Sequence, residues 1–223
     1  MISICMPYWD RQTQLDSSLD LYRALYPDVD LEVSIADDGS QTPVYATGCL
    51  ITFLPKKAAA LNPCVPINVA VKASHGDVIV LTNPEVHHRD QILQEMHAEL
   101  RRAGTRGYVT ASCRNDSGEW LAHSTIKGGE EGRGPFPHGS QFHFCAMLYR
   151  SLWYRAGGFD EDYRDGQAFD DNDWLWRLDD AGAQFCHRDD LIVHHEKSHT
   201  SWPKGGWHRN AALLRSKWGH RWL

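Results

Sequence analysis

The sequence has 223 residues, of which 42% are hydrophobic, and a formal net charge of −6. This size and apolar content are typical of one compact domain with its own core. No apolar run approaches the roughly 20 residues that a membrane-spanning helix needs, and the N-terminus lacks the basic flank and cleavage site of a signal peptide, so the sequence predicts a cytoplasmic protein.

Short apolar runs rich in β-branched residues alternate with stretches of helical period. This alternation predicts an α/β protein with a mostly parallel central sheet flanked by helices. The run at 78–81 is apolar throughout, so its strand is expected at the centre of the sheet. In chain order we expect a strand at 2–6, a helix at 15–26, strands at 31–36 and 50–54, a helix at 67–73, a strand at 77–82, a helix at 92–100, strands at 108–112 and 142–150, a helix at 171–181 and a strand at 191–195.

Two segments have an unusual composition. Residues 128–140 contain five glycines and two prolines, which predicts a loop that is either a connector or a lid over substrate. Residues 197–223 carry six Lys or Arg, four Trp and no acidic residue. This basic segment could bind a nucleic acid or lie at an anionic membrane surface, and it could equally be a helix docked through its Trp side chains.

Polar side chains follow three of the predicted strands, at 7–11, 37–40 and 83–85. Ligands of open α/β sheets collect at the carboxyl ends of the strands, so these groups outline one crevice. A carboxylate such as Asp38 can accept a hydrogen bond from a nucleobase, and an aromatic ring such as that of Tyr8 can stack on the base.

Three carboxylates lie within four positions, at Asp170, Asp171 and Asp173, among bulky apolar residues. Carboxylates this close raise one another's pKa, which is a common way to obtain a side chain that accepts a proton near neutral pH. The cluster therefore indicates the catalytic end of an enzyme.

Several motifs occur in a defined order along the chain. The sequence of these motifs resembles that of the family 2 glycosyltransferases, which have the Rossmann-like GT-A fold and transfer a sugar with inversion. The motifs are ISICMPYWDR at 2–11, IADDGS at 35–40, NVAVKASHGD at 68–77, GGFDE at 157–161, DDNDWLWR at 170–177, VHH at 193–195, and Asn210 followed by Lys217-Trp218.

The resemblance implies one GT-A domain over residues 1–223. Residues 1–112 would form the nucleotide-binding half, residues 113–196 the acceptor-binding and catalytic half, and residues 197–223 the basic Trp-rich segment. The donor would be a nucleotide-diphosphate-sugar, a UDP-sugar first of all, and the acceptor a glycan, a lipid-linked saccharide or another hydroxyl compound. The implied nucleotide contacts are Pro7, Tyr8, Asp10, Arg11, Asp38 and Asn68.

The resemblance also assigns the chemistry. Glu85 stands at the last carboxylate of the family's DXD metal motif and would hold Mn²⁺ or Mg²⁺ together with His194 or its neighbour His195. Asp171 would be the general base, with Asp170 and Asp173 as the other candidates. The implied acceptor contacts are Phe159 and Trp174.

Two other interpretations remain open at this point. The DXD position reads Thr82-Asn83-Pro84-Glu85, with a single carboxylate, so the chain could be a sugar- or nucleotide-binding module that has lost catalysis. The basic segment is compatible with a glycosyltransferase that acts on modified DNA bases.

Overall fold

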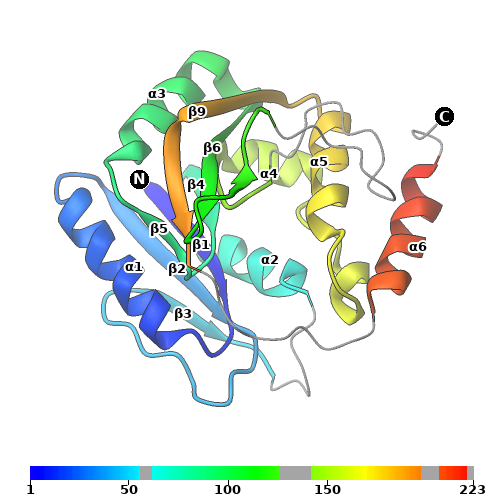
Figure 1. Ribbon diagram of the computed structural model, residues 1–223, viewed down its shortest axis with the longest axis horizontal. Coiled ribbons are helices and arrows are strands. Elements are labelled where there is room, and N and C mark those ends of the chain that lie inside the picture. The colour runs from blue at the N-terminus through cyan, green and yellow to red at the C-terminus, as the bar shows by residue number, and fades with distance from the viewer. Residues whose placement is uncertain (56–61, 126–141, 197–205, 220–223) are drawn as a thin grey trace.

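The structure is a computed structural model that describes residues 1–55, 62–125, 142–196 and 206–219, and it shows helices on both faces of one sheet (Figure 1). The predicted loop at 128–140 lies outside the described residues. The strands are β1 (Ile2–Tyr8), β2 (Leu31–Asp37), β3 (Leu50–Phe53), β4 (Val78–Thr82), β5 (Val86–His88), β6 (Gly107–Asn115), β7 (Trp120–Ala122), β8 (Cys145–Tyr149) and β9 (Gln184–His195). The helices are α1 (Gln12–Leu25), α2 (Cys64–Ala73), α3 (Ile92–Ala103), α4 (Arg150–Ala156), α5 (Asp170–Asp180) and α6 (Trp207–Trp218), with short 3₁₀ turns η1 (Gly104–Arg106) and η2 (Glu161–Asp165).

The sheet is mixed, so the prediction of a mostly parallel sheet is wrong. Its order is β3-β2-β1-β4-β8-β6-β9-β5, with β7 paired to β6. The pairs β1–β2, β1–β4, β2–β3 and β6–β9 are parallel, whereas β8 runs antiparallel to both β4 and β6. A parallel connection requires a crossover, usually a helix, but the described residues between β6 and β8 contain only the short strand β7.

The two predicted halves of the chain share this sheet. The boundary predicted after residue 112 falls inside β6, and β8 from the second half lies between β4 and β6. The side chains predicted to bind nucleotide and to catalyse transfer therefore project from one continuous sheet.

Strand β4 lies at the centre of the sheet, as the sequence predicts. All five of its residues are buried, and it pairs with β1 on one side and β8 on the other. Val78 and Val80 belong to the core on one face, and Ile79 and Leu81 to the core on the opposite face. This alternation is the period of two expected for a strand with helices on both sides.

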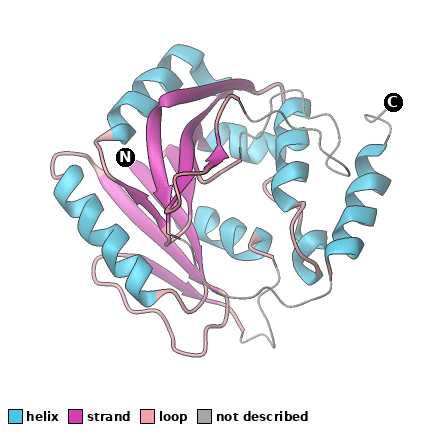
Figure 2. Ribbon diagram, viewed as in Figure 1, coloured by secondary structure: helices cyan, strands magenta, loops and turns pink. Residues whose placement is uncertain are grey.

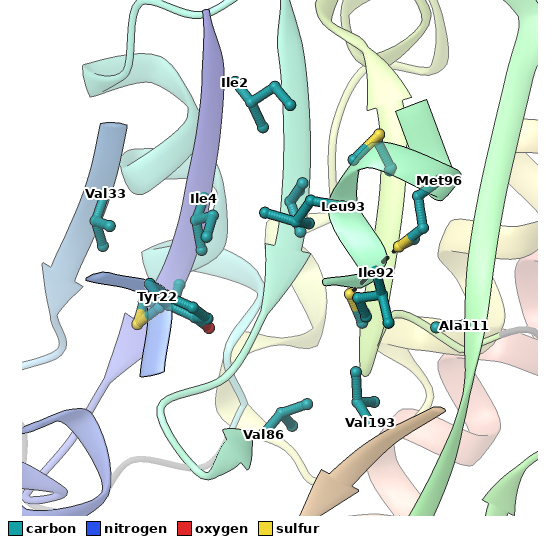
Figure 3. Packing of buried hydrophobic residues seen from close by; sticks show 14 of the residues in the cluster. Ile2, Ile4, Tyr22, Val33, Val86, Ile92, Leu93, Met96, Ala111 and Val193 are labelled. Atoms are coloured by element: carbon teal, nitrogen blue, oxygen red, sulfur yellow. Dashed lines mark hydrogen bonds between the residues drawn. The ribbon is translucent and has the colours of Figure 1, made fainter. Parts of the chain in front are cut away.

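Helices α1 and α3 cover one face of the sheet (Figure 1). In α3, Ile92, Leu93, Met96 and Leu100 are buried and recur at helical spacing, which confirms the predicted amphipathic helix. Figure 3 shows Leu93 and Met96 of α3 in the same core as Ile4 of β1.

Helices α2, α4 and α5 cover the other face, and α6 lies outside α5 (Figure 2). An aromatic cluster fills this core. The ring of Trp174 is 4.9 Å from the rings of both Trp153 and Phe159, measured between centroids. Leu214 of α6 is fully buried against the same core, so the described part of the basic segment is a docked helix. None of the described helices combines the length and apolar character that crossing a membrane requires.

Candidate active site

A cavity of about 420 Å³ opens beside the start of α5. Five parts of the chain form its walls: the residue before α2, the residue after β4, the segment before β8, the turn before α5 with the first residues of that helix, and the first residue of α6. Among the side chains that line it are Asn83, His143, Phe144, Asp170, Asp171 and Trp207. The cavity thus combines two of the three predicted acidic residues with aromatic walls, at a volume usual for small-ligand sites.

The turn that leads into α5 has an uncommon backbone conformation. Ala168 and Phe169 have φ angles of 57° and 69°, the left-handed region that non-glycine residues rarely occupy. The carbonyl of Ala168 accepts hydrogen bonds from the amide groups of Asn62, at 3.3 Å, and Asn210, at 3.0 Å. Strained turns persist only where surrounding contacts hold them. These two amides therefore fix the residue at which α5 begins, and with it the direction in which the carboxylates of α5 face the cavity.

Asp170 and Asp171 lie in different environments within this cavity. Asp170 is 5% exposed, and its Oδ1 accepts a hydrogen bond of 2.8 Å from Asn62. Burial, and then the charge of Asp171, raise the pKa of Asp170 to about 7. Asp171 is half-buried at the cavity wall and accepts a hydrogen bond from the backbone N–H of Asn172 at 2.8 Å. Asp170 can therefore exchange a proton near neutral pH.

Replacing Asp170 with Asn should make the protein more resistant to unfolding at alkaline pH. The folded state binds the Asp170 proton more tightly than the unfolded chain, whose aspartates have a pKa of about 3.9. The contribution of Asp170 to the free energy of unfolding therefore falls as pH rises from about 4 to about 7. Above that range the stabilisation is fully lost and falls no further. We therefore expect the Tm difference between D170N and wild type to be more positive at pH 8 than at pH 4.5. Each kcal/mol of destabilisation that the substitution removes should raise the Tm by about 2–4 °C.

Thermal unfolding across this pH range tests the effect. The matched control is Asp180→Asn, an exposed carboxylate at the end of the same helix. A Tm difference for D170N that does not change with pH would contradict the assignment.

Asp173 has a structural position. Its side chain is fully buried, and its two oxygens accept hydrogen bonds from Arg177 Nε at 2.6 Å and Trp218 Nε1 at 2.7 Å. Tyr163 donates a further bond of 3.3 Å. Because three donors from two helices and η2 surround it, Asp173 braces α5 against α6 and does not line the cavity.

Glu85 and His195 come together next to the cavity. Glu85 Oε1 lies 3.8 Å from His195 Nε2, and the His195 ring packs edge-on against Phe144, which lines the cavity. His194 faces the opposite side of β9, where it lies across from His87, because side chains alternate along a strand. Of the two predicted histidines, the structure therefore brings His195 to Glu85.

The pair Glu85–His195 is compatible with a divalent cation. Two ligands with bonds of about 2.1 Å can be at most about 4.2 Å apart on one ion, so a separation of 3.8 Å lets both reach it. The described residues contain no group of three or more side chains suited to a metal. An ion held here would need ligands from water or from a bound phosphate.

The predicted nucleotide contacts from β1 and β2 lie at the carboxyl ends of these neighbouring parallel strands. Asp38 is buried, and its backbone N–H donates to the carbonyl of Tyr8 at 2.8 Å. Tyr8 is 2% exposed, so its ring belongs to the core. Asp10 accepts hydrogen bonds from the backbone N–H groups of Gln41 and Thr42, at 3.0 and 3.2 Å, and thereby anchors the loop after β2.

Pro7 and Arg11 flank these residues. Pro7, within β1, is half-buried beside Ala36 of β2, and Arg11 stands at the start of α1, where its guanidinium donates to the Asp10 carbonyl at 3.2 Å. Both remain accessible at the strand ends, which is where the sequence places the nucleotide.

Asn68, Phe159 and Trp174 lie in the core. The Asn68 amide donates to the Phe159 carbonyl at 2.8 Å and accepts from the Phe159 N–H at 2.9 Å. Gly158 has a φ of 70°, and a Cβ there would lie 2.8 Å from Asn68 Oδ1, so the turn requires glycine. Phe159 and Trp174 stack within the aromatic cluster and do not reach the cavity. The structure thus places these three residues where they hold the fold.

Comparison with known proteins gives a likeness of fold. No family model matches the sequence, and no curated protein matches it. A structure of S. aureus TarS 1–349 aligns with a TM-score of 0.68 and 14% identity, covering 87% of this chain and 60% of that one. The complexes of TarS 1–349 with UDP-GlcNAc and with UDP align with TM-scores of 0.68 and 0.67, at 13% and 14% identity, covering 90% and 88% of this chain and 60% of each TarS chain.

The chain has a GT-A-like fold. It spans about 60% of the TarS 1–349 structures. Likeness at this identity concerns the GT-A-like scaffold, so the function of the cavity has to be argued from the side chains that line it.

The sequence analysis missed three polar or aromatic residues of the candidate site. Asn62 gave no signal, because a single amide outside any periodic run looks like an ordinary loop residue. His143 fell at the start of a predicted strand, whereas β8 begins at Cys145 and leaves His143 in the cavity wall. Trp207 was visible only as one of four Trp residues in the basic segment.

Proposed function

We propose that this chain is an inverting glycosyltransferase of family 2 that transfers a sugar from a UDP-sugar to an acceptor hydroxyl. The observation that carries the proposal is the pair Asp170–Asp171 in a cavity, with the pKa of Asp170 raised to about 7. The GT-A-like fold supports it, since TarS, a glycosyltransferase, has been solved with UDP-GlcNAc and with UDP.

In this proposal Asp171 is the general base. It takes the proton of the acceptor hydroxyl as the hydroxyl oxygen attacks the anomeric carbon, and the bond from that carbon to the diphosphate oxygen breaks on the opposite face. Asp171 suits this role because its carboxylate lines the cavity at the surface, whereas Asp170 is buried and bonded to Asn62. Asp170 then keeps a second, exchangeable proton beside the base.

Glu85 and His195 would hold Mn²⁺ or Mg²⁺. When bound, such an ion neutralises the negative charge that collects on the departing diphosphate. The edge-on contact between His195 and Phe144 places this pair beside the wall of the cavity that contains Asp171.

Replacing Glu85 with Gln should weaken the dependence of UDP binding on Mn²⁺. The change removes the negative charge of one of the two ligands with little change in shape, so the gain in UDP affinity on adding Mn²⁺ should shrink by about tenfold. Calorimetry with and without Mn²⁺ measures this gain, and Glu119→Gln, an exposed glutamate after β6, is the control. Equal Mn²⁺ dependence in E85Q and wild type would rule out Glu85 as a ligand.

The function itself is tested with a panel of UDP-, GDP- and dTDP-sugars, with and without Mn²⁺. We expect binding of the UDP-sugars and slow release of UDP by hydrolysis. Neither binding nor hydrolysis with any donor would contradict the proposal.

A binding module without catalysis is the second candidate. The single carboxylate at 82–85 and the lack of a third metal ligand among the described residues favour it. Calorimetry that shows metal-independent donor binding, together with no product, would support it over the enzyme.

Nucleic acid as the sugar acceptor has less support. Lys217 donates to Asp160 and, at 3.0 Å, to Asp162, and Arg209 donates to the Asp162 carbonyl at 2.8 Å. These basic groups of α6 therefore bind acidic residues and carbonyls of the same chain.

A further inference from the structure

We propose that the cavity binds an acceptor saccharide whose ring packs on Trp207 and whose hydroxyl groups are hydrogen-bonded by His143. This inference rests on the proposed glycosyltransferase function and names the acceptor class of that site. It assigns roles to two residues that no sequence motif indicated.

Trp207 is held in place but open to a ligand. Its ring packs edge-to-face against Phe169, with 5.0 Å between centroids, and it is 45% exposed although it lines the cavity. The preceding Gly206 packs closely on the turn before α5, where a Cβ would lie 3.0 Å from the Cα of Gly166. An exposed, immobilised indole offers an apolar surface for the C–H groups of a sugar ring at little cost in conformational entropy.

His143 has a ring nitrogen, Nδ1, that no described residue hydrogen-bonds. The residue is 8% exposed and lines the cavity. Burial lowers the pKa of His143 to about 4, so the ring is neutral at physiological pH and has one donor and one acceptor nitrogen. A neutral imidazole in a confined site suits hydroxyl groups, which both donate and accept.

The remaining walls favour a neutral saccharide over a polyanion. Asp171 lines the cavity, and its negative charge would repel phosphate groups brought close to it. Phe144 and Trp207 give it two aromatic sides, while Asn83 adds an amide next to the end of β4. Aromatic faces combined with carboxylate, amide and imidazole groups match the alternating C–H and O–H surface of a sugar.

The test uses the full-length protein saturated with UDP and an array of neutral oligosaccharides built from glucose, galactose and N-acetylglucosamine, next to sulfated saccharides and single-stranded oligonucleotides. We expect wild-type protein to be retained on neutral saccharides. Trp207→Ala and His143→Ala should each weaken retention by about tenfold, and Trp207→Phe should restore part of it. Tyr154→Ala, which removes an aromatic ring 59% exposed on α4, is the control.

The outcomes separate the two claims. If wild type does not bind UDP in calorimetry, the proposed function fails, and this inference fails with it. If wild type binds UDP but is not retained on any saccharide, or is retained on oligonucleotides instead, only the acceptor assignment is overturned. Retention of W207A and H143A equal to that of wild type also overturns it. If an alanine variant has a lowered Tm, the acceptor assignment is judged from the retention of Trp207→Phe and of wild type on the array.

Once an acceptor saccharide is found, steady-state kinetics give a second readout. W207A should raise the acceptor KM by about tenfold with a smaller change in kcat, because stacking contributes to binding in the ground state as well as in the transition state. A purely structural role for Trp207 would lower the amount of active enzyme and leave the acceptor KM unchanged.

Discussion

Replacing Asp171 with Asn is expected to reduce sugar transfer by about 10³-fold while UDP binding stays close to wild type. The variant keeps the shape of the side chain and the oxygen that accepts from the Asn172 N–H, but it cannot take up the acceptor proton. Transfer is measured by release of UDP in the presence of acceptor, and donor affinity by calorimetry.

Two comparisons make this result specific. Asp180→Asn removes an exposed carboxylate from the same helix and should keep full activity. Asp170→Asn reports on the neighbouring acid. If D171N transfers at the wild-type rate and D170N does not, the base is Asp170, and the roles proposed for the two carboxylates must be exchanged.

Replacing Trp174 with Ala is expected to lower the free energy of unfolding by about 3–5 kcal/mol. The indole is fully buried between Trp153 and Phe159, so its removal leaves a cavity that rigid neighbouring rings cannot fill. For a domain of this size the Tm should fall by roughly 10 °C or more, as seen by thermal unfolding followed by circular dichroism.

The result also distinguishes a core residue from an acceptor contact. Trp174→Phe retains most of the buried volume and should recover much of the lost Tm, with an unchanged acceptor KM. A wild-type Tm for W174A together with a raised acceptor KM would show that Trp174 meets substrate after all.

The closing motif of the chain has a clear structural role. Asn210 donates to the Tyr163 and Ala168 carbonyls, both at 3.0 Å, Lys217 binds Asp160, and Trp218 donates to Asp173. All three side chains of α6 thus bind the segment that carries the acidic cluster. The helix holds the turn before α5 in the position that presents Asp170 and Asp171 to the cavity.

The spacing of hydrophobic residues along the sequence predicted those helices and strands whose buried residues recur at a regular interval. The stripe of α3 and the apolar run of β4 could be read directly, because both depend only on which faces are buried. Strand β9 was predicted only at 191–195, although it begins at Gln184, because its first half contains the polar run His187–Asp190. The direction of β8 could not be read, since an apolar run is the same in either orientation.

The site could be predicted in part. The proximity of Asp170 to Asp171 follows from their adjacency. The family resemblance implied that Glu85 meets His194 or His195, and the structure brings His195 to Glu85. Asn68 could not be recognised as a clamp, because its partner Phe159 is 91 positions away and only the fold brings the two together. The same holds for Trp207, whose position at the cavity depends on how α6 docks.

A crystal structure of the protein with UDP and Mn²⁺ tests the central claim most directly. The account predicts that the diphosphate lies between the carboxyl ends of β1 and β2 and the pair Glu85–His195, with the cavity of Asp171 open on the far side of the donor. UDP bound elsewhere, or a bound UDP from which no path leads to the Asp171 carboxylate, would contradict it.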